Sequence, residues 1–440
     1  MHPDQAPHNI SSIADLMLPA QTIRRISDKI GGYLETDDYM ATGSLKLAIV
    51  GCGGMAHGHL RAYELIQRKE PMKFEFAAMC DPVLDSAKRF ADEASTHQGP
   101  KPRVYAKLED MLTKEQLDAA DICTPHSDHH VAAIACLNAG INIMTEKPFG
   151  VTIRASKAII AAAERNKKIA ATAENVRRGL SQRTSHWIIN EEGTIGKPRL
   201  FYSQQTNWED PSAEREWHWR VDKWLGGGGM VMDSGAHFCD TIRYLYGDPD
   251  TVYARVMRLE EWPHKKGATA VMDDREDTWV ATINFKNGVV GMWSWTMAVP
   301  AHNFTHVVHY GSKGCILDHG DAFHGPFNNA EIIVQDGAKR IIIPMTEMQR
   351  KFLDQLDPAR KKELFPHGLS DGVEIECYDF LDAIEKKRKP EVDGETGMKA
   401  KAICEAIYES AYLGQAVRYD DVLSGKVEGY QRPINEHWGL

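Results

Sequence analysis

Three polar side chains have types and spacings that suit chemistry on an alcohol. Lys147 lies in TEKPFG (145–150), and a lysine ammonium can hydrogen-bond a hydroxyl and stabilise the alkoxide that forms from it. Asp233 and His237 lie four residues apart in GGGGMVMDSGAHFCD (226–240), so on a helix they would share one face. The carboxylate would then orient the histidine as a general base for the alcohol proton. The alternatives are a surface lysine at the end of a strand and an ordinary pair on a helix surface.

A glycine-rich turn gives a reason to expect a redox cofactor beside these groups. In AIVGCGGMA (48–56), Gly51 permits a tight turn, Gly53 lets a pyrophosphate approach the backbone, and Ala56 lets the helix pack close to the strand. Asp81 follows the next apolar run, and a carboxylate there suits the ribose hydroxyls of NAD and repels the 2′-phosphate of NADP. We therefore predict NAD as cofactor, with NADP disfavoured and an ordinary tight turn as the alternative. Lys147 would stabilise the alkoxide that precedes hydride loss.

The elements that must position these residues alternate between strand and helix from residue 45 onward. The pattern predicts strands at 45–50, 74–81, 119–125, 141–148 and 168–175, and helices at 56–69, 82–94, 129–140 and 153–166. Strands joined by single helices form right-handed βαβ units and a parallel sheet, which is the Rossmann pattern. Ligands bind at the carboxyl ends of such strands, where TPHSDHH (124–130) and TEKPFG both fall.

After about residue 175 the pattern changes to longer β-rich runs, such as KPRLFYSQQTNW (197–208) and TWVATINF (278–285). Asn287-Gly288 predicts a hairpin, and 397–417 predicts a C-terminal helix. We expect an α/β protein with a Rossmann doubly wound parallel sheet at 45–174 and a second α/β domain with a large, open, mostly antiparallel sheet at 175–440. Residues 1–44 form an N-terminal extension with one candidate helix, either a mobile leader or an arm that packs on a neighbouring subunit.

Composition and charge exclude several classes of protein. The 440-residue chain has a formal net charge of −10 and a pI of about 6.0, which argues against nucleic acid or an anionic membrane as the main partner. No stretch approaches the roughly 20 apolar residues of a membrane span. Eight scattered cysteines without a CxxC pair indicate reduced thiols, so we expect a cytoplasmic protein. Neither the Asp233–His237 pair nor the cluster of His126, Asp128, His129 and His130 offers a convincing ligand set, so we predict no metal site.

An aromatic and basic segment precedes Asp233. It contains Trp208, Trp217, Trp219 and Trp224 together with Arg220 and Lys223. Aromatic faces suit the C–H surfaces of sugars, and arginine or lysine can hold hydroxyls or an anionic group. The alternative is that most of these tryptophans pack in the interior. If Arg220 and Lys223 face the substrate, an acidic or sulfonated sugar would fit.

The chain resembles the Gfo/Idh/MocA family of NAD(P)-dependent oxidoreductases, which includes inositol dehydrogenases and glucose–fructose oxidoreductases. The likeness rests on motifs that follow one another in order: AIVGCGGMA, TPHSDHHVAAIACLNAGINIMTEKP, AENVRR, GTIGKPRL, GGGMVMDSGAHFCDTIRYLYG, FKNGVVG, YGSKGCI and DFLDAIEKKRKPEVDGETGMKAKAICEAIYESAYLGQAV. It implies a Rossmann domain followed by an α/β domain with an open sheet, and homodimers or homotetramers that form through that sheet. It also implies hydride transfer between NAD and a sugar, polyol or glycoside.

The resemblance implies a role for each candidate residue. Lys147 would be the catalytic lysine of the EKP motif, and Asp233 and His237 would face the substrate, with His237 as acid/base. The implied cofactor contacts are Gly51, Gly53, Gly54, Met55, Ala56, Asp81, Thr124, Pro125, His126, His129, Glu146, Lys147 and Asn175. The implied substrate contacts are Lys147, Trp219, Arg220, Asp233 and His237. One departure is His126, which stands where the family usually has asparagine and could add a titrating contact.

Three functions follow from these motifs. The first is an NAD-dependent dehydrogenase that acts on a secondary alcohol of a sugar, polyol or glycoside. The second is a redox-neutral glycosidase that oxidises C3 transiently, eliminates the aglycone and regenerates bound NAD. The third is an NAD-binding sensor without catalysis, against which the presence of Lys147, Asp233 and His237 argues.

Overall fold

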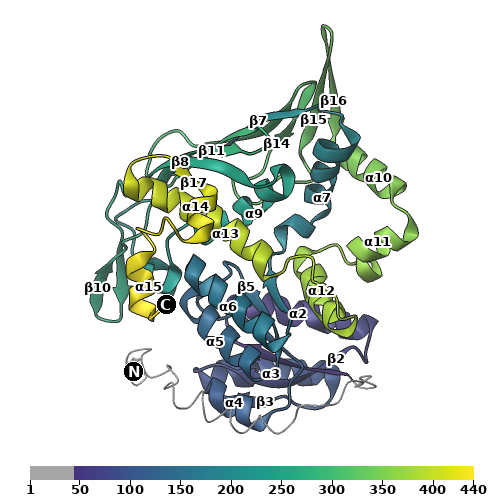
Figure 1. Ribbon diagram of the computed structural model, residues 1–440, viewed down its shortest axis with the longest axis vertical. Coiled ribbons are helices and arrows are strands. Elements are labelled where there is room, and N and C mark those ends of the chain that lie inside the picture. Colours follow the sequence, from purple (N-terminus) through teal and green to yellow (C-terminus); the bar gives the residue numbers. More distant parts are fainter. Residues whose placement is uncertain (1–43) are drawn as a thin grey trace, which may run out of the picture.

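The computed structural model describes residues 44–440, which form two halves, each built on one large sheet (Figure 1). The predicted N-terminal arm and its candidate helix fall on residues 1–43 and lie outside the described residues. Within the described part, no helix is long and apolar enough to cross a membrane. Every cysteine of the chain lies in this part and is a free thiol.

The first half is a six-stranded parallel sheet in the order β3-β2-β1-β4-β5-β6. Its strands are β1 (Leu45–Val50), β2 (Phe74–Cys80), β3 (Arg103–Tyr105), β4 (Ala119–Ile122), β5 (Asn142–Glu146) and β6 (Ala170–Ala173). Its helices are α2 (Gly54–Lys69), α3 (Leu84–Gln98), α4 (Leu108–Lys114), α5 (His126–Asn138) and α6 (Ile153–Asn166). Alternate residues of β1 point to opposite faces, so Leu47 and Ile49 share a core with α2 and α3, whereas Ala48 and Val50 share one with α5 and α6. This strand order confirms the predicted doubly wound Rossmann sheet.

The sequence pattern does not predict β3 and α4. A strand of three residues at the edge of a sheet shows no periodicity, and α4 is only seven residues long. The predicted helix at 129–140 begins three residues earlier, at His126. Residues 126–130 of the TPHSDHH motif therefore form the first turn of α5, and Thr124 and Pro125 precede it.

The second half is a nine-stranded mixed sheet in the order β16-β15-β14-β13-β7-β12-β11-β8-β17. The strands are β7 (Pro198–Thr206), β8 (Pro249–Met257), β11 (Thr278–Phe285), β12 (Val290–Thr296), β13 (Phe304–Gly311), β14 (Gly314–Asp318), β15 (Glu331–Asp336), β16 (Lys339–Pro344) and β17 (Val417–Arg418), and β9 (Pro263–Lys266) with β10 (Thr269–Met272) forms a separate hairpin. β7 and β12 pair in parallel, and their other neighbours pair antiparallel. The predicted hairpin at Asn287-Gly288 joins β11 to β12, with Gly288 at φ +89°.

The remaining helices pack between the two sheets and beside them (Figure 1). They include α7 (Leu180–Trp187), α8 (Lys223–Gly226), α9 (Gly235–Tyr246), α10 (Met345–Gln355), α11 (Pro358–Leu364), α12 (Gly372–Glu385), α13 (Gly394–Leu413), α14 (Tyr419–Ser424) and α15 (Arg432–Trp438). Helix α13 packs against β8 and α9 of the second half and against α6 and β6 of the first. It therefore holds the carboxyl edge of the Rossmann sheet against the second sheet.

Helix α12 completes the core of the first half, although it comes late in the sequence. Its side chains Ile375, Cys377, Phe380 and Leu381 are buried in the same apolar cluster as α2 and α3. The chain then returns to the second half through the segment that contains Val392. The carbonyl of Val392 accepts a hydrogen bond from the N–H of Thr172 in β6. The two halves are thus tied by packing as well as by the connection at the end of β6.

The outer face of the nine-stranded sheet carries exposed apolar side chains. The register places Tyr253, Met292 and Tyr202 in one row across this face, and Val290 and Tyr310 in the next row. Tyr253, Met292, Val290 and Tyr310 are all exposed large apolar residues. A sheet face of this kind is typical of an interface with another protein.

Replacing Phe380 with alanine should lower the free energy of unfolding by about 3–5 kcal/mol, because its ring is 1% exposed and its loss leaves a cavity against α2. The midpoint of urea unfolding measures the change. Tyr412→Ala, at a side chain that is 63% exposed, should shift the midpoint little. Equal midpoints for the two variants would show that α12 does not stabilise the Rossmann half.

Candidate active site

The predicted catalytic lysine and aspartate meet between the two halves. Lys147 follows β5, and its Nζ lies 3.0 Å from Asp233 Oδ1 and 3.0 Å from the backbone oxygen of Asp233. Arg220 Nε lies 2.9 Å from the other carboxylate oxygen. Burial alone would raise the pKa of Asp233, but the charges of Lys147 and Arg220 hold this pKa well below its ordinary value. The site therefore contains a firmly ionised carboxylate that fixes the lysine ammonium.

The predicted pairing of Asp233 with His237 is wrong. Helix α9 begins at Gly235, so Asp233 lies in the preceding turn and the spacing of four residues does not place the two on one helical face. His237 pairs instead with Glu174, whose Oε1 lies 2.8 Å from Nδ1. Glu174 directly follows β6. The orienting carboxylate thus comes from the Rossmann sheet and the histidine from the second half.

Glu174 is suited to hold His237 in one orientation. Burial raises the pKa of Glu174, but the ion pair with His237 lowers it below its ordinary value, so the carboxylate stays ionised. An ionised acceptor at Nδ1 fixes a proton on that nitrogen and leaves Nε2 as the atom that exchanges a proton. The ring of His324 lies 5.4 Å from that of His237, and His324 Nδ1 lies 3.0 Å from Asp321.

A buried network holds the backbone of Lys147. Lys147 N–H donates to Glu146 Oε2 at 3.0 Å, and the other oxygen of Glu146 lies 3.0 Å from His59 Nε2. His59 Nδ1 lies 2.8 Å from Asp121 Oδ2, and both side chains are fully buried. Burial alone would lower the pKa of His59, but Asp121 raises it well above its ordinary value. A charged imidazole between two carboxylates therefore fixes the end of β5.

The two histidines predicted as cofactor contacts have different surroundings. His126 Nδ1 lies 2.9 Å from the oxygen of Gly226, and Nε2 lies 3.7 Å from Asp233, so this residue joins the Lys147–Asp233 cluster. Burial lowers its pKa well below the ordinary value, so the ring is neutral. His129 is fully buried, and its ring nitrogens lie 3.0 Å from the oxygens of Thr124 and Pro148. It joins the loops that follow β4 and β5 and presents no free nitrogen.

Three of the four glycines before Asp233 allow a close approach that side chains would prevent. Gly227 has φ +78°, and a Cβ there would lie 2.9 Å from the oxygen of Val151. A Cβ on Gly229 would lie 2.6 Å from the carboxylate of Glu276. Glu276 accepts hydrogen bonds from Gly229 N–H at 3.1 Å, from Val231 N–H at 2.9 Å and from the Tyr408 hydroxyl at 2.9 Å. Sequence reasoning missed Glu276, which is the anchor of the turn that carries Asp233.

The glycine turn leaves an open approach for a dinucleotide. Gly51 has φ +88°, and a Cβ there would lie 2.7 Å from the oxygen of Cys123, so glycine is required. A Cβ on Gly53 or Gly54 would instead meet no protein atom within 4 Å. No side chain of the described residues caps the N-terminus of α2 that begins here, and free N–H groups at such a terminus suit a phosphate.

Other predicted cofactor residues line the same edge. Asp81 Oδ2 accepts from the N–H of Cys52 at 2.7 Å, directly beside the glycine turn. Thr124 Oγ1 and Asn175 Oδ1, after β4 and β6, are buried without a hydrogen-bond partner in residues 44–440. Polar atoms orphaned in this way favour a ligand. Ala56 is buried, Met55 is 38% exposed, and Pro125 precedes α5. These residues fit NAD, which would lie along the carboxyl edge of the sheet.

The aromatic segment lies at the surface near Asp233. Trp219 packs edge-on against His126 with 4.7 Å between ring centroids, so the structure brings this predicted substrate residue into the cluster. Trp208 and Trp224 are exposed, and Trp217 and Trp219 are partly exposed. The alternative of interior packing is therefore wrong for all four tryptophans of the segment.

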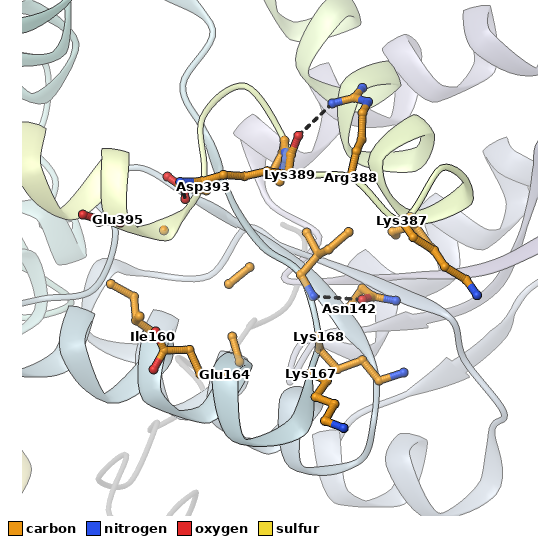
Figure 2. Close-up of a pocket in the computed structure, with 16 residues that line it drawn as sticks. Asn142, Ile160, Glu164, Lys167, Lys168, Lys387, Arg388, Lys389, Asp393 and Glu395 are labelled. Carbon is orange, nitrogen blue, oxygen red and sulfur yellow. Dashed lines mark hydrogen bonds and ion pairs between the residues drawn. The ribbon is translucent and has the colours of Figure 1, made fainter. Parts of the chain in front are cut away.

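A separate cavity of about 710 Å³ opens at the opposite edge of the Rossmann sheet (Figure 2). It is lined by Asn142, the first residue of β5, and by Lys167, Lys168 and Lys387. These lysines follow the C-termini of α6 and α12, where positive charge stabilises the exposed carbonyl ends of a helix. None of the predicted site residues lines it, and we assign it no part in the chemistry.

Known families match most of the chain. Residues 45–174 match the profile described as an oxidoreductase family, NAD-binding Rossmann fold, and residues 191–418 match the C-terminal alpha/beta domain of an oxidoreductase family. Levoglucosan dehydrogenase of Pseudarthrobacter phenanthrenivorans is 28% identical over 62% of this chain and 73% of that protein. D-glucoside 3-dehydrogenase of Escherichia coli is 24% identical over 86% of this chain and 98% of that protein.

Solved structures share the fold. An NAD binding oxidoreductase of Klebsiella pneumoniae has a TM-score of 0.69 at 21% identity and covers 86% of this chain and 99% of its own. Levoglucosan dehydrogenase in complex with NADH and levoglucosan has a TM-score of 0.67 at 23% identity, with the same coverage. At these identities the likeness establishes the arrangement of both halves.

Replacing Glu276 with glutamine should loosen the turn that carries Asp233. The amide offers one oxygen where the carboxylate offers two, so either the N–H of Val231 loses its acceptor or the N–H of Gly229 keeps only the Tyr408 hydroxyl, at a cost of about 1–3 kcal/mol. Hydrogen exchange measured by mass spectrometry should show faster exchange at 226–233 and unchanged exchange in β1. Glu260→Gln, at an exposed residue, is the control. Unchanged protection at 226–233 in both variants would rule out the anchoring role.

Proposed function

The chain belongs to the Gfo/Idh/MocA family of NAD-binding oxidoreductases, and on that premise we propose that it oxidises a secondary alcohol of a sugar, polyol or glycoside with NAD. Two of its relatives carry the names levoglucosan dehydrogenase and D-glucoside 3-dehydrogenase. The observation that supports the proposal best is the meeting of Lys147 with Asp233, and of His237 with Glu174, at the carboxyl edge of the Rossmann sheet.

Two pairs of residues share the proposed chemistry: Lys147 with Asp233, and His237 with Glu174. NAD, when bound, supplies the acceptor for a hydride. Lys147 donates a hydrogen bond to the reacting hydroxyl and stabilises the negative charge that develops on its oxygen. Asp233 holds the ammonium in place through the contact of 3.0 Å. His237 Nε2 takes the proton of the hydroxyl, while Glu174 stabilises the imidazolium that results.

A redox-neutral glycosidase would use the same residues, so net reduction of NAD decides between the two activities. The first test incubates the purified chain and NAD with free sugars, inositols, sugar acids and aryl glycosides, and follows NADH absorbance and aglycone release in the same wells. NADH that accumulates with a substrate supports the dehydrogenase. Aglycone release without net NADH would replace it with the glycosidase. Tight NAD binding without turnover of any compound would favour the sensor.

We further propose that two copies of the chain associate through the outer face of the nine-stranded sheet. The exposed apolar side chains Tyr253, Val290, Met292 and Tyr310 support this assembly, because burying a contiguous apolar face contributes about 25 cal/mol per Å². The active-site residues lie on the other side of the sheet, where α9 and α13 pack. Association in this way leaves the substrate approach open in each copy.

Lys147→Ala and His237→Ala should each lower turnover by about 10²- to 10⁴-fold, since each removes a group that acts on the reacting hydroxyl. The dissociation constant of NAD, measured by calorimetry, should change little, because the glycine turn and Asp81 are untouched. Lys114→Ala, at an exposed lysine on α4, serves as the control. Turnover close to that of the unchanged chain in either site variant would refute the role of that residue.

Met292→Glu should convert the assembly to monomers, because a carboxylate at the centre of the outer face would be buried without a partner. Light scattering coupled to size-exclusion chromatography measures the mass. Met272→Glu changes a residue of similar exposure on the β9–β10 hairpin, so it should leave the mass unchanged. A monomeric mass for the unchanged chain at micromolar concentration would overturn the proposed interface.

A further inference from the structure

Arg220 lies at the exposed end of the cluster around Asp233. Its Nε lies 2.9 Å from Asp233 Oδ2, opposite the oxygen that pairs with Lys147. The side chain of Arg220 is 40% exposed, against 20% for Asp233 and 14% for Lys147. A molecule that approaches Lys147 from solvent therefore passes the guanidinium group.

Half of this guanidinium group is available to a ligand. In the described chain, no hydrogen bond engages the two terminal nitrogens of Arg220, and its shortest contact with Asp233 is made by Nε. The group lies over the ring of Trp219, with 4.3 Å from its central carbon to the ring centroid. Stacking fixes the plane of the guanidinium, and two parallel N–H donors in a fixed plane match the two oxygens of a carboxylate or sulfonate.

Two cations of the cluster share one counter-charge. Lys147 and Arg220 both contact the single carboxylate of Asp233. His126, the third group beside this carboxylate, is neutral because burial lowers its pKa. The carboxylate beside Arg220 is therefore also engaged by the lysine, and a second anion beside the guanidinium would add a favourable contact.

Lys223 does not share this position, although the sequence placed it beside Arg220 as a candidate. Its Nζ lies 4.4 Å from the centroid of the Tyr430 ring, whose hydroxyl donates to the oxygen of Gly227. The cation–π contact therefore engages the ammonium group of Lys223 with Tyr430. Arg220 is thus the residue of this pair that can recognise a substrate.

We infer that Arg220 recognises an oxyanion on the carbohydrate, so that the substrate class is an acidic sugar that carries a carboxylate or a sulfonate. The inference rests on the proposed dehydrogenase function. The terminal nitrogens of Arg220 bind the oxyanion, and Lys147 receives the hydroxyl that reacts. A neutral sugar of the same size lacks the group that the terminal nitrogens of Arg220 would bind.

The test uses the full-length chain with matched pairs of compounds: hexuronic acids and 6-sulfonated hexoses, each beside the neutral hexose of the same stereochemistry. Calorimetry in the presence of NADH gives binding, and NADH formation gives kcat/KM. We expect the acidic member of at least one pair to bind about 10- to 100-fold more tightly than its neutral partner. This preference should fall as ionic strength rises.

Variants of Arg220 distinguish a role in substrate recognition from a role in positioning Asp233. Arg220→Gln should lower the affinity for the acidic member far more than the affinity for the neutral member, and Arg220→Lys should restore part of the preference as a point charge. Lys223→Gln is the matched control and should keep the preference. An equal loss for both members of each pair would reduce Arg220 to a positioning residue for Asp233 and overturn the inference.

Three other outcomes would distinguish a failure of this inference from a failure of the proposed function. Oxidation of neutral sugars with no preference for the acids would overturn acidic-sugar recognition and leave the dehydrogenase function intact. Absence of binding for every acidic member, with NADH bound normally, would overturn the inference as well. Aglycone release from acidic glycosides without net NADH would refute the dehydrogenase and keep the recognition by Arg220.

Discussion

The ion pair between Lys147 and Asp233 is the constraint on which the rest of the structure depends. It joins the end of a Rossmann strand to a turn of the other half, and both side chains are largely buried. Removing two charges from water costs several kcal/mol per ion unless the pair geometry is good. The contact of 3.0 Å to the carboxylate and the second one to the backbone oxygen of Asp233 meet this condition. The two halves must therefore be held at a fixed separation along the whole carboxyl edge.

The packing between the halves serves this separation. Helix α13 touches elements of both sheets, and its Gly394 and Gly397 lie so close to Phe149 and Thr172 that side chains would not fit. The glycines of the run 226–229 allow close packing on the Asp233 side of the Lys147–Asp233 pair. Tyr408 and Glu276 fill the space beside them. Glycines at these positions lower the stability of isolated elements, and here they let backbone segments approach closely enough to join the pair.

The sequence predicts a feature of the fold or site well when the signal for it is local, and poorly when the feature depends on contacts between distant segments. The edge rule of parallel sheets correctly placed Lys147, Thr124 and Asn175 at one edge, because it needs only local strands and their ends. The same rule could have identified Glu174, since it ends the run KIAATAE as Lys147 ends its own. The pairing of Asp233 with His237 failed because spacing was applied across a turn. The sequence nowhere distinguishes Glu276 from its acidic neighbours in DDRED, since its role depends on a contact with a loop 45 residues away.

The position of Lys147 is determined at both ends of the residue. At the backbone, its N–H bonds a carboxylate of Glu146 that His59 and Asp121 hold from α2 and β4. At the ammonium, Asp233 is held by a turn that Glu276 anchors. Neither end needs to move when a hydroxyl arrives, so the stabilising charge is already in place when the alkoxide forms. Preorganisation of this kind is the largest electrostatic contribution that a protein makes to such a step. It also explains why so many buried charges are tolerated here: each is paired or hydrogen-bonded, and together these contacts restrict the atoms of the lysine and of its partner.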